Sequence, residues 1–370
     1  MRERKGWIDY ARVCAVFCVV LCHATESFYG AVVRGEARID TGLWMLENTL
    51  FTVGRLGVPL FLAITGALLL GRELEPGKFY RKSLFPLVGT TEIWIVLNYA
   101  FVCVFQDVEF SLADLVCEML FLRTLELSHM WYMPMIIGLY LALPFLSMAV
   151  RGAKGPGAFR LPYLAGIAAF LVIPTVNVFL AEAVPGGTPL KLKLDFDLLG
   201  GVYVLYLLGG YFIAQGVLEK IKGKYLLLAG GGCFLLNTAA QYYLYANEFY
   251  KSNRLLWYSS ACIFVMGLAL FEGIRRMAGM PGRRAVRLIE DAARCSFGIY
   301  LLHKPILVLT LKCLPVENWG EPAGIFVLLA AGLGISLLFL LPFVRRWKRA
   351  GRVLFLIKSK TPLQATGHQT

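Results

Sequence analysis

The chain has 370 residues, a formal net charge of +13, 58% hydrophobic residues and 16% charged residues. Soluble domains carry roughly 25% charged residues, so this composition excludes an ordinary soluble protein. It predicts an all-α polytopic membrane protein, and the positive charge does not indicate a nucleic-acid partner because no RNA- or DNA-binding motif accompanies it.

Ten apolar runs are each long enough to cross about 30 Å of hydrocarbon, which takes roughly 20 helical residues. They cover 8–29, 43–70, 84–106, 130–150, 160–181, 198–218, 224–246, 255–274, 294–314 and 322–344. The second run contains Gly54, Gly57 and Pro59, which either bend it or leave its start as a loop. Residues 111–124 are weakly amphipathic and form either a surface helix or an ordered loop.

The basic residues are unevenly divided between the two sides of the predicted membrane. With the N-terminus in the cytoplasm, most of the 37 lysines and arginines fall in cytoplasmic segments. Because such an excess marks the cytoplasmic side, we predict that both termini are cytoplasmic. We expect one transmembrane domain over residues 1–350 and a short basic, polar tail over residues 351–370. The protein is then a multi-pass protein of a plasma (inner) membrane.

The first run has an arginine and a histidine at its two ends. At about 100° per residue, the separation between Arg12 and His23 leaves them within roughly 20° of each other around the helix and about 16 Å apart along it. Ala15, Val16 and Val19 lie between them on the same face and leave room for a narrow groove. This stripe suits a ligand whose anionic end lies at the cytoplasmic edge. The alternatives are a membrane-interface anchor for Arg12 and a packed, hydrogen-bonded His23.

The nine cysteines form no CxxC pair, so we predict neither a zinc ribbon nor a disulfide framework. Cys14, Cys18 and Cys22 recur every four residues and therefore share one face of the first helix. We expect that face to differ from the one with the arginine and the histidine. Small residues on a membrane helix usually serve close packing between helices.

Ionisable groups inside apolar runs are costly to bury and are therefore candidates for function. Besides the pair on the first helix, these groups are Asp9, Arg55, Glu92, His129, His303 and Lys304. Each has a structural alternative. His129 can belong to an interfacial aromatic belt, His303 can be a satisfied core histidine, and Arg55 can pair with Glu92 or Asp9.

Motifs of several enzyme classes are absent from the sequence. It contains no HExxH pair, no P-loop, no GxGxxG and no GxSxG elbow. Three histidines on separate runs could meet at a metal, but their predicted depths in the membrane differ. We therefore predict no metal site.

Four segments carry motifs in a fixed order along the chain. They are WIDYAR followed by ten residues and His23, RLGVPLFLAITGALLL (55–70), SHMWYMPMIIGLYLALP (128–144) and CSFGIYLLHKPIL (295–307). Together they resemble the signature segments of the membrane acyltransferase 3 family, and the resemblance covers essentially the whole chain. One departure is the basic cluster that enters the third helix, which is reduced here to Arg81 and Lys82.

The resemblance implies transfer of an acyl group, usually acetyl, from acyl-CoA to a hydroxyl of an envelope glycan or lipid-linked sugar in a bacterium. Acyl-CoA (acetyl-CoA) is then a co-substrate, and no cofactor is bound tightly. An exporter of a polysaccharide or its precursor is the alternative, because some relatives are linked to polymer export. The inverted repetition that many transporters show is not visible between the two halves. A membrane subunit related to lipid or amino-acid modification also stays open.

Acyl transfer needs a base for the acceptor hydroxyl, donors for the oxyanion and cations for the coenzyme phosphates. Histidine suits the first task because its ordinary pKa lies near neutrality. We predict catalytic roles for His23, His303 and Glu92, coenzyme binding by Arg12, Arg55, Arg81 and Lys82, and acceptor binding by His129, Trp131 and Asp9.

Overall fold

The computed structural model describes residues 6–153, 155–182, 184, 187–191, 201–247, 253–277 and 283–357. Within these ranges the regular structure is helical and contains no strand, so the all-α prediction is confirmed. The predicted tail over 351–370 lies outside the described residues from residue 358 onward.

The helices follow one another with short connections. In chain order they are α1 (Trp7–Arg34), α2 (Thr41–Gly54), α3 (Gly57–Leu69), α4 (Pro76–Phe79), α5 (Phe85–Phe105), α6 (Leu112–Met119), α7 (Tyr132–Gly152), α8 (Arg160–Ile167), α9 (Ile173–Glu182), α10 (Gly201–Ala214), α11 (Gly223–Ala246), α12 (Ala261–Met277), α13 (Arg283–Cys313), α14 (Glu321–Arg345) and α15 (Lys348–Phe355). One turn of π-helix joins α4 to α5 and another joins α8 to α9. Of the two predictions for residues 111–124, the helix is confirmed, because α6 forms there.

Seven helical segments in the described ranges are long and apolar enough to cross a membrane. They are Trp7–Arg34, Thr41–Leu69, Pro76–Phe105, Ser128–Gly152, Pro156–Ala181, Leu288–Cys313 and Glu321–Arg345. The other three predicted runs correspond to α10, α11 and α12. Helices α10 and α12 have 14 and 17 residues, and α11 contains Asn237 and Gln241. A total of ten crossings therefore stays a prediction, as does the orientation of the termini.

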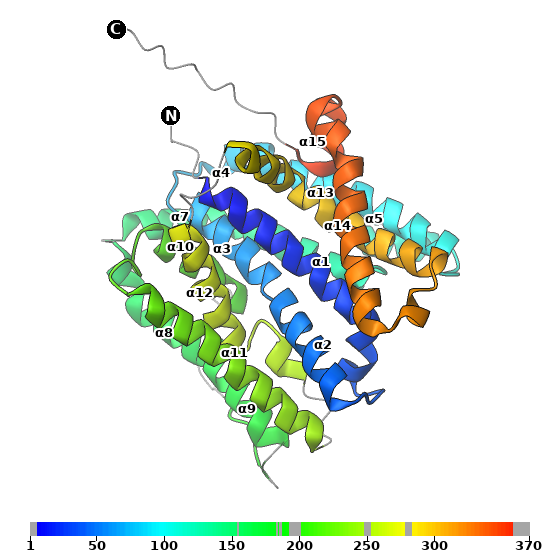
Figure 1. Ribbon diagram of the computed structural model, residues 1–370. Helices are drawn as coiled ribbons and strands as arrows, with labels where there is room; N and C mark the ends of the chain where they lie inside the picture. The colour runs from blue at the N-terminus through cyan, green and yellow to red at the C-terminus, as the bar shows by residue number, and fades with distance from the viewer. Residues whose placement is uncertain are drawn as a thin grey trace.

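Helix α1 lies in the middle of the bundle, where it packs against α2, α3, α12, α13 and α14 (Figure 1). Two glycines of the second span allow this close approach. A β-carbon at Gly54 would lie 2.6 Å from backbone atoms of Cys22, and one at Gly57 would lie 2.6 Å from a methyl group of Val19. Larger residues at these glycines would therefore push α1 away from α2 and α3.

The second span is interrupted at Arg55 and Leu56, between α2 and α3. Its start is helical, because the side chain of Asp40 caps α2 by accepting hydrogen bonds from two backbone N–H groups. Pro59 lies in the first turn of α3, where its missing N–H costs no intrahelical bond. The interruption lies where the bend was predicted, and the alternative of an initial loop is wrong because the start of the span is helical. The interruption leaves Arg55 at the junction of two helices.

One ring contact relates the ends of α1 and α12 to each other. The ring of Trp7, at the start of α1, lies 5.2 Å from that of Phe271 in the second half of α12. Residues 253–260, which precede α12, therefore lie toward the other end of the bundle. We call the end with Trp7 the inner end, following the predicted orientation, and the opposite one the outer end. Figure 1 shows the start of α1, α4 and α15 together at the inner end.

Helix α15 is fastened across α5 at the inner end. The hydroxyl of Thr90 donates to the backbone oxygen of Val353 at 2.7 Å, and Nε1 of Trp94 donates to the backbone oxygen of Leu354 at 2.7 Å. The chain then turns at Leu356, which has the left-handed φ of 49°. This turn brings the side chain of Leu356 to the cavity described next.

Candidate functional site

A cavity of about 350 Å³ lies between α1, α3, α7 and α13. Its wall combines apolar residues with a set of polar and aromatic residues. The latter are Arg12, Cys22, His23, Arg55, Thr65, His129, Trp131, Tyr132, Tyr140, Tyr258, Arg294, Ser296 and Tyr300. An apolar cavity with a few polar groups converging in it is the usual form of a small-molecule site.

Two arginines line the cavity nearest the inner end. Arg12 on α1 lies 3.2 Å from a carboxylate oxygen of Asp9, and Arg294 on α13 lies 3.6 Å from one of Asp291. Eleven residues of helix at 1.5 Å each place His23 about 16 Å deeper than Arg12. Nine residues place His303 about 13 Å deeper than Arg294 in the same way. Two neighbouring helices therefore repeat one arrangement, with a cation at the inner end and a histidine further in.

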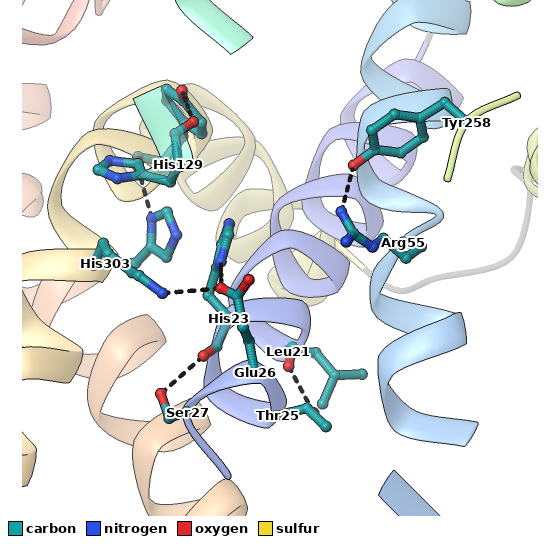
Figure 2. A network of polar contacts seen from close by, with 11 residues as sticks. Leu21, His23, Thr25, Glu26, Ser27, Arg55, His129, Tyr258 and His303 are labelled. Atoms are coloured by element: carbon teal, nitrogen blue, oxygen red, sulfur yellow. Dashed lines mark hydrogen bonds and ion pairs between the residues drawn. The ribbon is translucent and has the colours of Figure 1, made fainter. Parts of the chain in front are cut away.

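Three histidines meet in the interior of the bundle (Figure 2). Their ring centroids are 5.2 Å apart for His23 and His303, 5.0 Å for His129 and His303, and 6.3 Å for His23 and His129. His129 and His303 are 1% and 0% exposed. The prediction that the three histidines lie at different depths is wrong, because the turn Ser128–Trp131 carries His129 into the bundle. Among the described residues, no three His, Cys, Asp or Glu side chains are placed to hold a metal ion together.

His23 is held by an ion pair that connects α1 to α13. Its Nδ1 lies 2.7 Å from Oε2 of Glu26, and Nζ of Lys304 lies 3.0 Å from the same oxygen. A carboxylate accepts hydrogen bonds, so Nδ1 of His23 is the donor, and the lone pair of the neutral ring lies on Nε2. His23 lines the cavity. This pairing fixes both the tautomer and the orientation that a general base requires.

The other two histidines leave ring nitrogens without a partner among the described residues. His303 donates through Nδ1 to the backbone oxygen of Tyr300 at 2.7 Å, which leaves its Nε2 unpaired. Neither ring nitrogen of His129 has a hydrogen-bond partner. The hydroxyl of Tyr300 donates to the backbone oxygen of His129 at 2.8 Å and so holds the two elements together. Of the two residues, His129 lines the cavity, and His303 contacts it through the rings of His23 and His129.

Arg55 lies on the other side of His23 from the histidines (Figure 2). Its Nη1 donates to the hydroxyl of Tyr258 at 3.5 Å. The expected ion pair with Glu92 or Asp9 is not found: no carboxylate in the described part of the chain pairs with Arg55, and Asp9 pairs with Arg12. On α5, the buried Oε2 of Glu92 has no hydrogen-bond partner among the residues that the structure describes.

The structure separates the predicted site residues into two groups. Those that line the cavity are Arg12, His23, Arg55, His129 and Trp131, and His303 contacts two of them. Those outside its lining are Asp9, Glu92, Arg81 and Lys82, of which the last two are exposed on the π-helical turn before α5.

Sequence reasoning missed several residues of the site. Glu26 gave a usable signal, because it is a carboxylate inside the first apolar run and three residues after His23. Cys22 lines the cavity, so the expectation that the cysteine face avoids it is wrong for this residue. Tyr258 and Arg294 gave no distinct signal, because each lies at or near the start of a run and resembles an interface residue.

A comparison with known families gives one match. A family model described as an acyltransferase domain matches residues 5–355, which is essentially the whole chain. No curated protein and no solved structure gives a significant match. The matched region contains every cavity-lining residue except Leu356.

Proposed function

The chain belongs to the acyltransferase 3 family, and from this premise we propose that it transfers an acyl group from acyl-CoA to a hydroxyl of an acceptor. The acyl group is proposed to be acetyl, and the acceptor an envelope glycan or lipid-linked sugar at a bacterial plasma membrane. The motifs predicted the family correctly. The acetyl group, the acceptor and the location are taken from the family resemblance, and the arrangement of the site supports the roles of the donor and the base.

The observation that carries the proposal is that one cavity is lined both by arginines at its inner end and by His23, which is paired with Glu26. Arg12 and Arg294 lie nearest the inner end, where acyl-CoA would arrive from the cytoplasm, and they suit its phosphates. Arg81 and Lys82 are exposed on the turn that follows α4, and they add positive charge. The acyl end of the donor then reaches His23, deeper in the same cavity.

The proposed reaction uses His23 as the general base. Its Nε2 takes the proton of the acceptor hydroxyl while the hydroxyl oxygen attacks the carbonyl carbon of the thioester. The C–S bond then breaks, and the departing sulfur takes the proton from the imidazolium. Glu26 stabilises the imidazolium while it exists, and Lys304 keeps Glu26 ionised and in place. A ring nitrogen of His129 lacks a partner and can donate to the oxyanion.

The proposal predicts that membranes with this protein transfer label from acetyl-CoA to an envelope glycan. Replacing His23 by Gln should lower the rate about 10² to 10⁴-fold, which is the usual contribution of a general base. Labelled glycan is counted after removal of free coenzyme, with the same substitution at His368, in the tail, as the matched control.

Two results would contradict this account. One is full transfer by a stably expressed His23→Gln variant, which would remove His23 from the reaction. The other is vesicles that transport glycan and never acylate it, which would favour an exporter.

A further inference from the structure

We propose that Arg55 binds an anionic group of the acceptor, a carboxylate or a phosphate, so that acidic acceptors are preferred over neutral ones. The inference rests on the proposed function, because it names the substrate class of the same cavity. It concerns a cluster that we call the aromatic box, which consists of Phe51, Trp257 and Tyr258 around the guanidinium of Arg55.

The aromatic box surrounds the guanidinium with ring faces. The Cζ atom of Arg55 lies 4.7 Å from the ring centroid of Phe51, 4.7 Å from that of Trp257 and 5.8 Å from that of Tyr258. Such contacts fix the direction of a cation but leave its charge uncompensated, since a ring offers only a quadrupole. The box therefore holds Arg55 in position without neutralising it.

Arg55 differs from the other cavity arginines because no carboxylate of the described residues pairs with it. Arg12 has Asp9, and Arg294 has Asp291. In the described ranges Arg55 has the hydroxyl of Tyr258, and its buried Nε makes no hydrogen bond. Glu26, the carboxylate beside His23, is already engaged by His23 and Lys304.

An uncompensated cation within a membrane bundle is costly, and such residues generally face a partner or a ligand pathway. Arg55 lines the cavity, so a ligand in the cavity can contact its guanidinium. A planar guanidinium with free donors matches the two oxygens of a carboxylate or phosphate. The missing counter-charge is therefore expected to come with the ligand.

The position of the box assigns this anion to the acceptor and not to the acyl-CoA donor. Trp257 and Tyr258 belong to the segment 253–260, which lies toward the outer end, and Trp257 is 40% exposed. The donor phosphates have Arg12 and Arg294 at the inner end. Tyr258 also stacks on Trp131 at 5.6 Å, and Trp131 lies two residues from His129. The box thus joins an outward-facing surface to the histidines.

The test measures binding to the purified full chain in nanodiscs by tryptophan fluorescence, because Trp257 contacts the guanidinium. Glucuronate and glucose 1-phosphate are the two anionic probes, and glucose is the neutral one, all at equal ionic strength. We expect the wild-type protein to bind at least one anionic probe about tenfold or more tighter than glucose. Arg55→Met should bring the affinities of the three probes within about twofold, and Arg55→Lys should keep part of the preference.

The control is Arg34→Met, the same substitution at an exposed arginine paired with Glu36, and it should leave the preference unchanged. Preference for glucuronate alone identifies a carboxylate ligand, and preference for glucose 1-phosphate alone identifies a phosphate ligand. Equal binding of all probes by the wild-type protein, or an unchanged preference in Arg55→Met, overturns the inference.

Acyl transfer to the same probes separates this inference from the proposed function. Anion binding that depends on Arg55, without any acyl transfer, would contradict the proposed function and leave the anion site standing. Transfer to acidic and neutral acceptors with equal kcat/KM, in wild type and in Arg55→Met, would support the proposed function and overturn the inference. A rise in the KM for acyl-CoA in Arg55→Met, with the acceptor preference intact, would place Arg55 on the donor instead.

Discussion

The cavity holds its cations in two different ways at two depths. Nearest the inner end, Arg12 and Arg294 each lie beside an aspartate, whereas Arg55 lies deeper among aromatic rings. An ion pair at a partly exposed mouth keeps a cation ready for exchange, because water can replace either partner. A cation among aromatic rings has no carboxylate that a ligand must displace, so it favours a ligand with a negative charge. Under the proposed function, the inner end would recruit the donor, while the deeper part would select the acceptor and perform the reaction.

The deeper part should be the more sensitive to mutation, and after His23 itself Glu26 gives the largest expected effect. Glu26→Gln removes the charge that orients His23 and stabilises its imidazolium, so kcat should fall roughly 100-fold with little change in the KM for acyl-CoA. Steady-state kinetics with labelled acyl-CoA measures both constants. The control is Glu36→Gln, which removes an exposed ion pair with Arg34 and should cost less than about twofold. A loss confined to KM would contradict a role for Glu26 in the chemical step.

Mutations at the inner end should change the KM for acyl-CoA and leave kcat nearly unchanged. Arg12→Gln removes a phosphate-binding cation, so the KM for acyl-CoA should rise about tenfold while kcat stays within about twofold. The same assay measures it, with Arg34→Gln as the matched substitution outside the cavity. A fall in kcat at unchanged KM would place Arg12 in the chemical step and remove the distinction between the two depths.

The smallest effect is expected outside the cavity. Arg81 and Lys82 are exposed, so the double replacement by Gln should raise the KM for acyl-CoA only about twofold at low salt and not at all at high salt. Titrating salt in the transfer assay shows this directly. An effect larger than that of Arg12→Gln would mean that the coenzyme binds chiefly on the surface turn before α5.

The helical period of α1 predicted correctly that two of its ionisable residues face the same space. It placed Arg12 and His23 on one face, and both line the cavity. The break in the second span also followed from its glycines and Pro59. These features are local, because each depends on residues within one helix.

The remainder depends on contacts between distant segments. Lys304 reaches Glu26 across 278 positions of sequence, and Tyr258 reaches Arg55 across 203. The depth of His129 depends on how a short turn folds into the bundle, and hydropathy does not report that. The period of one helix determines on which face of that helix a residue lies. Only the packing of the bundle determines which residues of other helices this face contacts.

The central claim is that Glu26 acts through His23, and a double-mutant cycle tests it most directly. Transfer rates are measured for wild type, His23→Gln, Glu26→Gln and the double variant under saturating acyl-CoA. If Glu26 only orients and charges His23, the double variant should be as slow as His23→Gln and no slower. Losses that multiply in the double variant would show that Glu26 acts independently of His23 and would contradict the account.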